Sequence, residues 1–177
     1  MEMIMKAIVA VDSNWAIGRG NELLCHISED MKRFKELTTG NIVVMGRKTF
    51  ESLPNKKPLP NRTNIILTTN PNYTVEGAVV VHSLYDLLSK IHIIKNSEQQ
   101  IFVMGGGEVY KLLLPLCEEV YVTKVHYDFD DADVFFPNLD KDYRWKNPEE
   151  ISVINRDEKT GLQYEFVNYV STQVDEK

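Results

Sequence analysis

The sequence has no long hydrophobic run and no excess of positive charge. Its apolar stretches fall well short of the roughly 20 residues that a membrane-spanning helix requires. The opening segment, residues 1–6, has neither a basic leader nor a long apolar core followed by a cleavage site. We therefore expect a cytoplasmic protein that does not bind a membrane. The net charge of −6 disfavours binding to nucleic acid, whose affinity for proteins depends largely on Lys and Arg.

Cysteine is also scarce. The two cysteines, Cys25 and Cys117, lie far apart and outside any C-x-x-C or histidine-rich setting. This pattern argues against a zinc site and against a disulfide scaffold, so we expect two free thiols and no bound metal.

The length and composition are those of one folded domain. A chain of 177 residues with 43% hydrophobic and 26% charged residues is ordinary for a globular protein, and such a chain buries roughly 70% of the surface that it exposes when unfolded. We expect a single domain over residues 1–177, with a core from about residue 3 to residue 170 and short flexible ends.

The hydrophobic pattern predicts an α/β fold. Apolar runs rich in β-branched residues recur with helical patterns between most of them, and near-continuous runs are typical of parallel strands covered on both faces. Helices are expected to start at Ser28 and Ser83. We predict a central, mostly parallel sheet flanked by helices, with a C-terminal antiparallel hairpin around a turn at 157–161. The expected strands are 3–11, 42–45, 64–68, 78–81, 101–104, 119–126, 150–155 and 163–170.

Two strand-to-helix junctions carry the strongest local signals. At the first, an apolar run leads directly into Gly46, Arg47, Lys48 and Thr49, which suits an anion at a helix N-terminus. From this segment alone, an ordinary strand-to-helix turn with solvated basic residues is an equally good interpretation. At the second, residues 105–107 are consecutive glycines whose backbone a pyrophosphate could approach closely. Two such junctions in one sheet favour a dinucleotide over a single phosphate.

One acidic residue stands out in the helix that starts at Ser28. Asp30 lies in its first turn, next to an apolar stripe formed by Met31, Phe34 and Leu37. A first-turn acid usually faces solvent and complements the helix dipole. The functional alternative is a carboxylate in an apolar cleft that binds a cationic or amidine-like group of a ligand.

These motifs, taken in order, resemble the dihydrofolate reductase family over about residues 8–170. The resemblance rests on residues 8–10, 16–18 with Asn21, the acid-bearing helix at 28–34, and segments 45–52, 58–62, 64–68, 105–110, 121–123 and 135–137. It implies the fold of that family and NADPH-dependent reduction of 7,8-dihydrofolate to 5,6,7,8-tetrahydrofolate, with hydride transfer to pterin C6 and protonation at N5. It also implies a monomer, and a site that antifolate inhibitors occupy.

The resemblance assigns roles residue by residue. Asp30 matches the acid that pairs with the pterin 2-amino group and N3, and Thr123 matches the hydroxyl that supports it; the N5 proton is expected to arrive through water. The family peptide within the glycine run is cis, which here is Gly105 to Gly106. The residues implied for catalysis are Asp30, Thr123 and Leu23. Those implied for substrate binding are Ile8, Val9, Ala10, Asp30, Met31, Phe34, Ser52, Leu53, Leu59, Arg62 and Thr123. Those implied for cofactor binding are Ala10, Ile17, Asn21, Leu23, Gly46, Arg47, Lys48, Thr49, Leu67, Thr68, Thr69, Gly105, Gly106, Gly107, Glu108, Val109 and Tyr110.

The chain departs from the family pattern in its active-site loop. Residues 23–25 read Leu-Leu-Cys where the family usually has Leu-Pro-Trp, and residues 132–134 read Ala-Asp-Val where Gly-Asp-Thr is common. Losing the large ring should leave either a wetter pocket or a repacked loop, with altered loop dynamics. Two other functions remain open at this point: a pyrimidine reductase of riboflavin synthesis with a similar fold and cofactor, and a nucleotide-binding module that has lost turnover.

Overall fold

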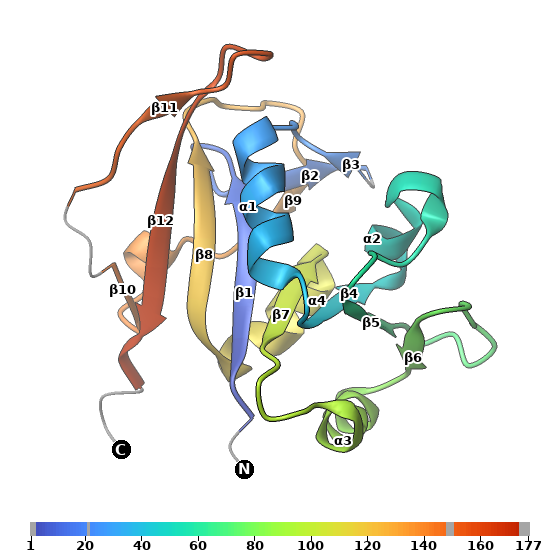
Figure 1. The fold of residues 1–177 in the computed structure, drawn as a ribbon. Coiled ribbons are helices and arrows are strands. Elements are labelled where there is room, and N and C mark those ends of the chain that lie inside the picture. Colours follow the sequence, from blue (N-terminus) through green and yellow to red (C-terminus); the bar gives the residue numbers. More distant parts are fainter. Residues whose placement is uncertain (1–2, 21, 148–150, 174–177) are drawn as a thin grey trace.

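The computed structural model describes residues 3–20, 22–147 and 151–173 (Figure 1). Asn21, one of the expected cofactor residues, lies outside the described residues, as does Glu150, the first residue of one expected strand.

The central sheet has the strand order β10-β12-β8-β1-β7-β4-β5-β6, and β11 also pairs with β12. All pairs from β8 to β6 are parallel, whereas β12 runs antiparallel to β8, β10 and β11. The mostly parallel sheet and its antiparallel C-terminal part are therefore confirmed. The strands are β1 (Met5–Val11), β4 (Ile42–Gly46), β5 (Thr63–Leu67), β6 (Val79–Val81), β7 (Ile101–Gly105), β8 (Cys117–Val125), β10 (Trp145–Lys146), β11 (Asn155–Arg156) and β12 (Gln163–Ser171).

A small second sheet and several helices complete the fold. The small sheet has the order β3-β2-β9, from β2 (Ala16–Arg19), β3 (Glu22–Leu23) and β9 (Val134–Phe135). The helices are α1 (Ser28–Thr38), α2 (Arg47–Glu51), α3 (Leu84–Ile94) and α4 (Gly107–Leu113), with 3-10 turns η1 (Pro54–Lys56), η2 (Leu114–Leu116) and η3 (Leu139–Lys141).

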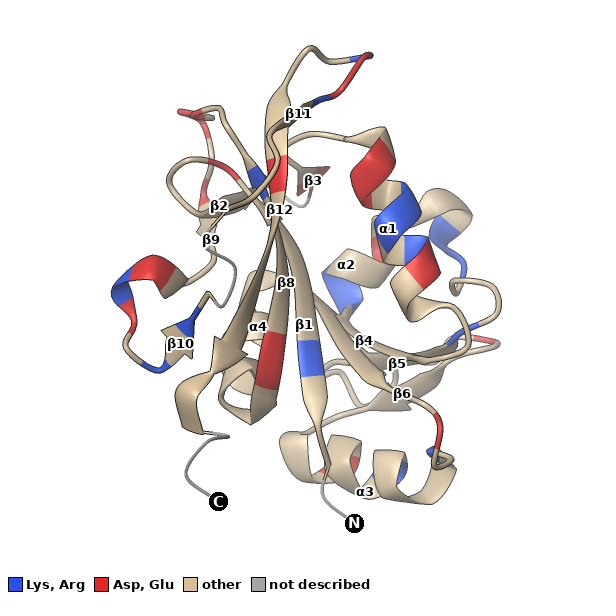
Figure 2. Cartoon of the chain, turned by 60° about the vertical axis from the view of Figure 1, so that its left-hand side comes forward, with Lys and Arg blue, Asp and Glu red and all other residues tan. Residues whose placement is uncertain are grey.

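Both faces of the central sheet are covered, which explains the continuous apolar runs. In β4, Val44 belongs to a cluster that includes side chains of α3 and α4, whereas Val43 and Met45 belong to a second cluster that includes Leu37 of α1. Successive strand residues point to opposite faces, so every position in such a strand is buried. Charged residues are accordingly sparse on the central strands (Figure 2). One exception is an ion pair of 3.2 Å between Lys6 Nζ and Glu119 Oε2.

The helix starts are confirmed, but they are capped differently. Ser83 Oγ accepts a hydrogen bond of 3.0 Å from the backbone N–H of Asp86. At α1 no side chain of the preceding residue caps the helix; instead, Asp157 Oδ1 accepts the backbone N–H of Ser28 at 3.3 Å. The turn between β11 and β12 thus satisfies one of the free N–H groups of α1.

One expected strand is largely wrong. Of residues 151–155, only Asn155 pairs with β12, and Ile151 and Val153 are exposed. Their apolar, β-branched side chains suggested a strand, but within the part of the chain that the structure describes no element covers them.

Candidate active site

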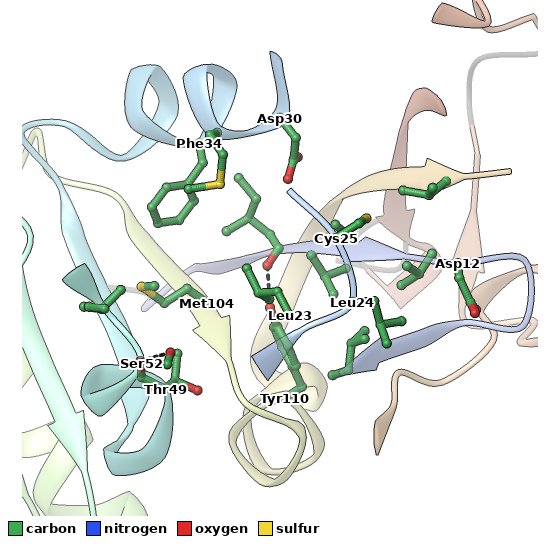
Figure 3. A pocket seen from close by; sticks show the side chains of 18 of the residues that line it. Asp12, Leu23, Leu24, Cys25, Asp30, Phe34, Thr49, Ser52, Met104 and Tyr110 are labelled. Carbon is green, nitrogen blue, oxygen red and sulfur yellow. Dashed lines mark hydrogen bonds between the residues drawn. The ribbon is translucent and has the colours of Figure 1, made fainter. Parts of the chain in front are cut away.

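A cleft of about 420 Å³ lies at the carboxyl ends of the parallel strands. Side chains of β1, the loop before α1, α1 itself and α2 converge on it (Figure 3). The structure brings together here all the expected substrate residues except Thr123: Ile8, Val9, Ala10, Asp30, Met31, Phe34, Ser52, Leu53, Leu59 and Arg62. Of the expected cofactor residues, the cleft wall also includes Ala10, Ile17, Leu23, Thr49 and Tyr110.

Asp30 is a carboxylate in apolar surroundings, not a solvated acid. It reaches into the cleft from the first turn of α1 (Figure 3). Thr123 lies behind it in β8, 2% exposed, and its Oγ1 donates a hydrogen bond of 2.5 Å to Asp30 Oδ1. Burial raises the pKa of Asp30 above its usual value, against the opposing effects of the Thr123 hydroxyl and the Arg33 charge. One carboxylate oxygen is thus held by the protein, and the other is available to a ligand.

Arg62 also lines the cleft. Its Nε donates to Pro60 O at 2.9 Å and its Nη1 to Thr38 Oγ1 at 3.2 Å, so the guanidinium is fixed in position. Its Cζ lies 6.0 Å from the ring centroid of Phe34. No carboxylate of the described residues forms an ion pair with it. A fixed guanidinium without an internal counter-ion suits a carboxylate on a ligand.

The two glycine junctions lie side by side. Strands β4 and β7 are neighbours, with Met45 opposite Gly105, so the segments that follow them meet at one edge of the sheet. A Cβ atom at Gly46 would lie 3.2 Å from Val109 Cγ2, and one at Gly106 would lie 3.2 Å from Thr49 Oγ1. The peptide between Gly105 and Gly106 is cis, as expected from the resemblance. The close approach of the two segments explains why glycine is required.

The adenosine side of the expected cofactor site lies next to this junction. Gly46 pairs with Leu67, which places Arg47 near the segment that follows β5 and contains Thr68 and Thr69. Arg47 Nη1 lies 3.1 Å from Glu51 Oε1, an ion pair within α2 that the sequence reasoning did not anticipate. Lys48, Thr69 and Glu108 are exposed, as residues that meet a ligand from solvent would be.

Tyr110 connects the cofactor side to the substrate side. Its hydroxyl donates a hydrogen bond of 2.6 Å to Ile8 O, and its ring lines the cleft (Figure 3). Burial raises its pKa, so the hydroxyl stays protonated and acts as a donor.

Sequence reasoning missed the residue that organises the active-site loop. Asp12 is 3% exposed, and its Oδ1 accepts the backbone N–H groups of Asn14 at 2.8 Å and Ala16 at 2.9 Å. Its Oδ2 accepts the N–H of Phe129 at 3.0 Å, which links two loops that are distant in sequence. The available signal was an acid followed by Ser and Asn directly after an apolar strand, a pattern typical of a turn in which Asp accepts backbone N–H groups.

A second set of contacts joins the same two loops nearer to solvent. Asp133 Oδ2 accepts the N–H of Gly20 at 3.0 Å, and the N–H of Asp133 donates to Gly18 O at 3.0 Å. Arg19 Nη1 lies 2.9 Å from Asp131 Oδ1. The segment that contains Asp131 and Asp133 is therefore bound directly to the active-site loop.

Both cysteines are free, as expected. Cys25 is partly buried and lines the cleft, whereas Cys117 is buried. Among the described residues, no group of three or more His, Cys, Asp or Glu side chains could hold a metal ion. No helix in the described part of the chain is both long and apolar enough to cross a membrane.

The α/β fold, with two adjacent glycine junctions at its strand ends beside a cleft that contains a partly buried acid, is typical of enzymes that use a dinucleotide. A family model described as dihydrofolate reductase matches residues 4–171. Curated relatives include the dihydrofolate reductases of Bacillus subtilis (strain 168), 40% identical over 92% of this chain and 91% of the relative, and of Neisseria gonorrhoeae, 37% identical over 92% and 95%. A solved dihydrofolate reductase from Enterococcus faecalis, complexed with NADP(H) and RAB-propyl, matches with a TM-score of 0.81 and 36% identity over 97% of this chain and 98% of the other. The chain belongs to the dihydrofolate reductase family.

Membership defines the reaction. The chain is an NADP-dependent oxidoreductase that reduces dihydrofolate to tetrahydrofolate.

Proposed function

We propose that the cleft binds 7,8-dihydrofolate with its pterin at Asp30 and its glutamate carboxylate at Arg62. The observation that carries this proposal is the Asp30 carboxylate itself, held by Thr123 in an apolar cleft that is also lined by the fixed guanidinium of Arg62. The free Asp30 oxygen and the one held by Thr123 together form a planar pair of acceptors. Such a pair matches the 2-amino group and N3 of a pterin, and charge strengthens both hydrogen bonds.

The remaining walls position the two rings. We assign three lining residues, Phe34, Leu53 and Met31, to the pterin and aminobenzoyl groups. Leu59, Ser52, Ile8, Val9 and Ala10 also line the cleft and are assigned to the substrate, with Ile8 and Val9 near the pterin. Bound NADPH supplies the hydride that is transferred to C6. The chain contributes alignment, water exclusion and charge.

We propose that the N5 proton comes from water rather than from Asp30 directly. Asp30 is committed to the 2-amino and N3 edge in this arrangement, and it favours the protonated pterin through its charge. Leu23 lies in β3, is 55% exposed and lines the cleft, and we assign to it the role of covering the nicotinamide side and limiting the entry of water.

We assign the cofactor to the two glycine junctions that follow β4 and β7, next to the cleft. Ala10 and Ile17 are placed to hold the nicotinamide carboxamide, with Tyr110 beside the ring. Gly46, Lys48, Thr49 and the segment of Gly105, Gly106, Gly107, Glu108 and Val109 are assigned to the diphosphate and adenosine. We assign Leu67, Thr68 and Thr69, together with Arg47, to the 2′-phosphate, because Gly46 pairs with Leu67 where β4 and β5 end.

The assay that tests the activity mixes the protein with NADPH and dihydrofolate and follows absorbance. Loss of the NADPH signal that depends on dihydrofolate supports the assignment. Turnover of a ribosylated pyrimidine instead would favour the riboflavin-pathway reductase, and tight NADPH binding without turnover of either substrate would favour a binding module.

Arg62→Ala should weaken dihydrofolate binding by about 10- to 100-fold, because a hydrogen bond to a charged group contributes roughly 1.5–3 kcal/mol. The affinity for NADPH should not change, since Arg62 lies outside the junctions assigned to the cofactor. Titration of each ligand separately measures both effects. Lys57→Ala removes an exposed charge from the same loop and is the matched control. If the two variants bind dihydrofolate equally well, Arg62 is only a surface cation.

Two variants test the cofactor assignments. Arg47→Gln tests whether this residue selects NADPH over NADH, and Lys48→Gln tests whether Lys48 binds the diphosphate that both cofactors carry. We expect Arg47→Gln to lower the affinity for NADPH by about tenfold and to leave the affinity for NADH unchanged. Only NADPH carries the 2′-phosphate that the Arg47 charge would contact. Lys48→Gln should lower the affinity for both cofactors to a similar extent. Fluorescence titrations with NADPH and NADH measure the four affinities. Equal losses for NADPH and NADH in Arg47→Gln would contradict the 2′-phosphate assignment.

We also propose that the enzyme acts as a monomer in the cytoplasm. A monomer is what the resemblance to the family implies, and the residues that line the cleft lie in one chain. Light scattering at assay concentrations and fractionation of the source cells test the two statements.

A further inference from the structure

Helix α1 is held on the central sheet at a second point, about one turn beyond Asp30. Arg33 lies three residues after Asp30, so the two side chains share one face of the helix. Arg33 Nη2 donates a hydrogen bond of 3.0 Å to Asn168 Oδ1 in β12. Its Cζ lies 4.4 Å from the ring centroid of Phe166 and 5.3 Å from that of Tyr121. A hydrogen bond and two aromatic rings therefore fix the position of this guanidinium.

The side chains that hold Arg33 belong to the same pair of strands as the side chain that holds Asp30. In the antiparallel pairing of β8 and β12, Thr123 lies opposite Phe166, whose ring contacts the guanidinium. Thr123 also donates the hydrogen bond to Asp30. Tyr121, which supplies the other ring, lies two residues before Thr123 in β8, so both side chains point to the same face of the strand. The acid and the cation of α1 are thus fixed against one continuous surface.

Arg33 also supplies a positive charge beside the carboxylate. Burial raises the pKa of Asp30, and the Thr123 hydroxyl and the Arg33 charge oppose this effect. Three other titratable groups interact with Asp30, and burial raises the pKa of each, so all are neutral at pH 7: Cys25, Tyr110 and Tyr164. The charged residues around this pair are Asp12, Lys35 and Arg62 on the cleft wall, Glu29 and Asp157 at the start of α1, and Lys6 and Glu119 beside Tyr121. Arg33 is the cation that offsets the burial of the carboxylate.

We propose that Arg33 is a positioning residue for the reaction, which holds the first turns of α1 on β8 and β12 and keeps Asp30 in the carboxylate form that the pterin requires. Its guanidinium lies against the sheet, so it acts on the pterin through Asp30 and not by contact. A guanidinium that is fixed in place acts on the carboxylate at a constant distance, whereas a mobile one would be screened more by solvent. This role rests on the proposed function, because it concerns the acid that we assign to the pterin.

The titration of Asp30 in the ligand-free protein tests the proposal directly. It is followed by the ¹³C NMR signal of the Asp30 carboxyl group, which is assigned by its absence in Asp30→Asn. Arg33→Gln and Arg33→Met both remove the positive charge, so the pKa of Asp30 should rise in each. Arg33→Lys keeps the charge and should leave the pKa closer to that of the parent. Lys32→Gln removes an exposed cation from the same helix and is the matched control, with no change expected.

Kinetics show whether the same change reaches the reaction. A protonated Asp30 cannot accept both hydrogen bonds from the pterin, so the KM for dihydrofolate in Arg33→Gln should rise as the pH falls from 8 to 5.5. We expect the KM at pH 5.5 to exceed that of the parent by about threefold or more, with a smaller difference at pH 8. A residue with a structural role alone would change the kinetic constants by the same factor at every pH.

Two results would overturn the proposal. One is an Asp30 that titrates at the same pH in the parent and in whichever of Arg33→Gln and Arg33→Met folds, and the other is an equal shift in Lys32→Gln. If neither charge-free variant folds, Asn168→Ala decides, because it frees the guanidinium but keeps its charge. The pKa of Asp30 should then rise by a smaller amount, and no rise would refute the role of Arg33. A shifted titration in a protein that does not turn over dihydrofolate disproves only the proposed function, and turnover without the shift disproves only the role of Arg33.

Discussion

Asp30→Asn should lower the rate of dihydrofolate reduction at pH 7 by about two to three orders of magnitude, within the range of roughly 10²–10⁴ that a positioned acid or base contributes. The asparagine side chain keeps the size of aspartate and can still accept the Thr123 hydrogen bond through its oxygen. It carries no negative charge, so it no longer favours the protonated pterin. The defect should therefore be greatest at neutral and higher pH, where the substrate is less protonated, and smaller in acid. Initial rates from pH 5 to 9, with NADPH saturating, give this profile.

Stability provides the control for the same variant. Because burial raises the pKa of Asp30 in the folded protein, the folded state binds more protons than the unfolded state between the two pKa values. Stability then falls as pH rises through that window, and at pH 7 the full cost of ionising the buried carboxylate is present. Asp30→Asn removes this cost and should stabilise the ligand-free protein at pH 7, which appears as a higher melting temperature. Loss of activity together with a higher melting temperature cannot be explained by unfolding.

NADPH affinity completes this prediction. We expect it to be nearly unchanged in Asp30→Asn, because the cofactor junctions at β4 and β7 do not include this helix. Parental activity at every pH would show that the carboxylate is not needed for the reaction. A variant that is less stable than the parent would instead show that the charge of Asp30 is well satisfied within the protein.

The sequence was most informative where a pattern repeats along the chain. The parallel strands were predictable because each is apolar at consecutive positions, as Val43, Val44 and Met45 show by burying side chains on both faces of the sheet. The junctions after β4 and β7 were predictable because glycine and cations follow those strands directly. The family pattern then brought Asp30 and Arg62 to one cleft, which periodicity alone could not do.

What the sequence could not show depends on contacts between distant segments. Nothing near Ser28 indicates that Asp157 caps its helix, because the acid belongs to a turn far along the chain. The run at 151–154 is rich in β-branched apolar residues, as strands are. Its burial depends on another element that packs against it, and the sequence of the run carries no information about that element. Asp12 was missed for the same reason, because one of its three backbone donors comes from Phe129.

Asp12→Ala should be the most destabilising of the substitutions considered. Alanine removes both acceptor oxygens at a position that is 3% exposed, and it leaves the N–H groups of Asn14, Ala16 and Phe129 without their partner. An unsatisfied buried donor costs about 1–3 kcal/mol, and water can reach some of these groups, so we expect a total loss of about 3 kcal/mol in the free energy of unfolding. Urea denaturation at pH 7 measures it.

Two further variants show whether the link between the loops matters for the reaction. Asp12→Asn keeps Oδ1 as an acceptor for Asn14 and Ala16 but turns an NH₂ group toward the N–H of Phe129, so it breaks only the bond between the loops. If that bond positions the loop over the nicotinamide side, Asp12→Asn should lower kcat more than it lowers stability. Asp131→Asn removes the exposed ion pair with Arg19 and is the control, with an expected loss below about 1 kcal/mol because solvent screens such pairs. Equal stability of Asp12→Ala and Asp131→Asn would mean that water replaces the Asp12 carboxylate at little cost, and the two loops would then be held together by packing alone.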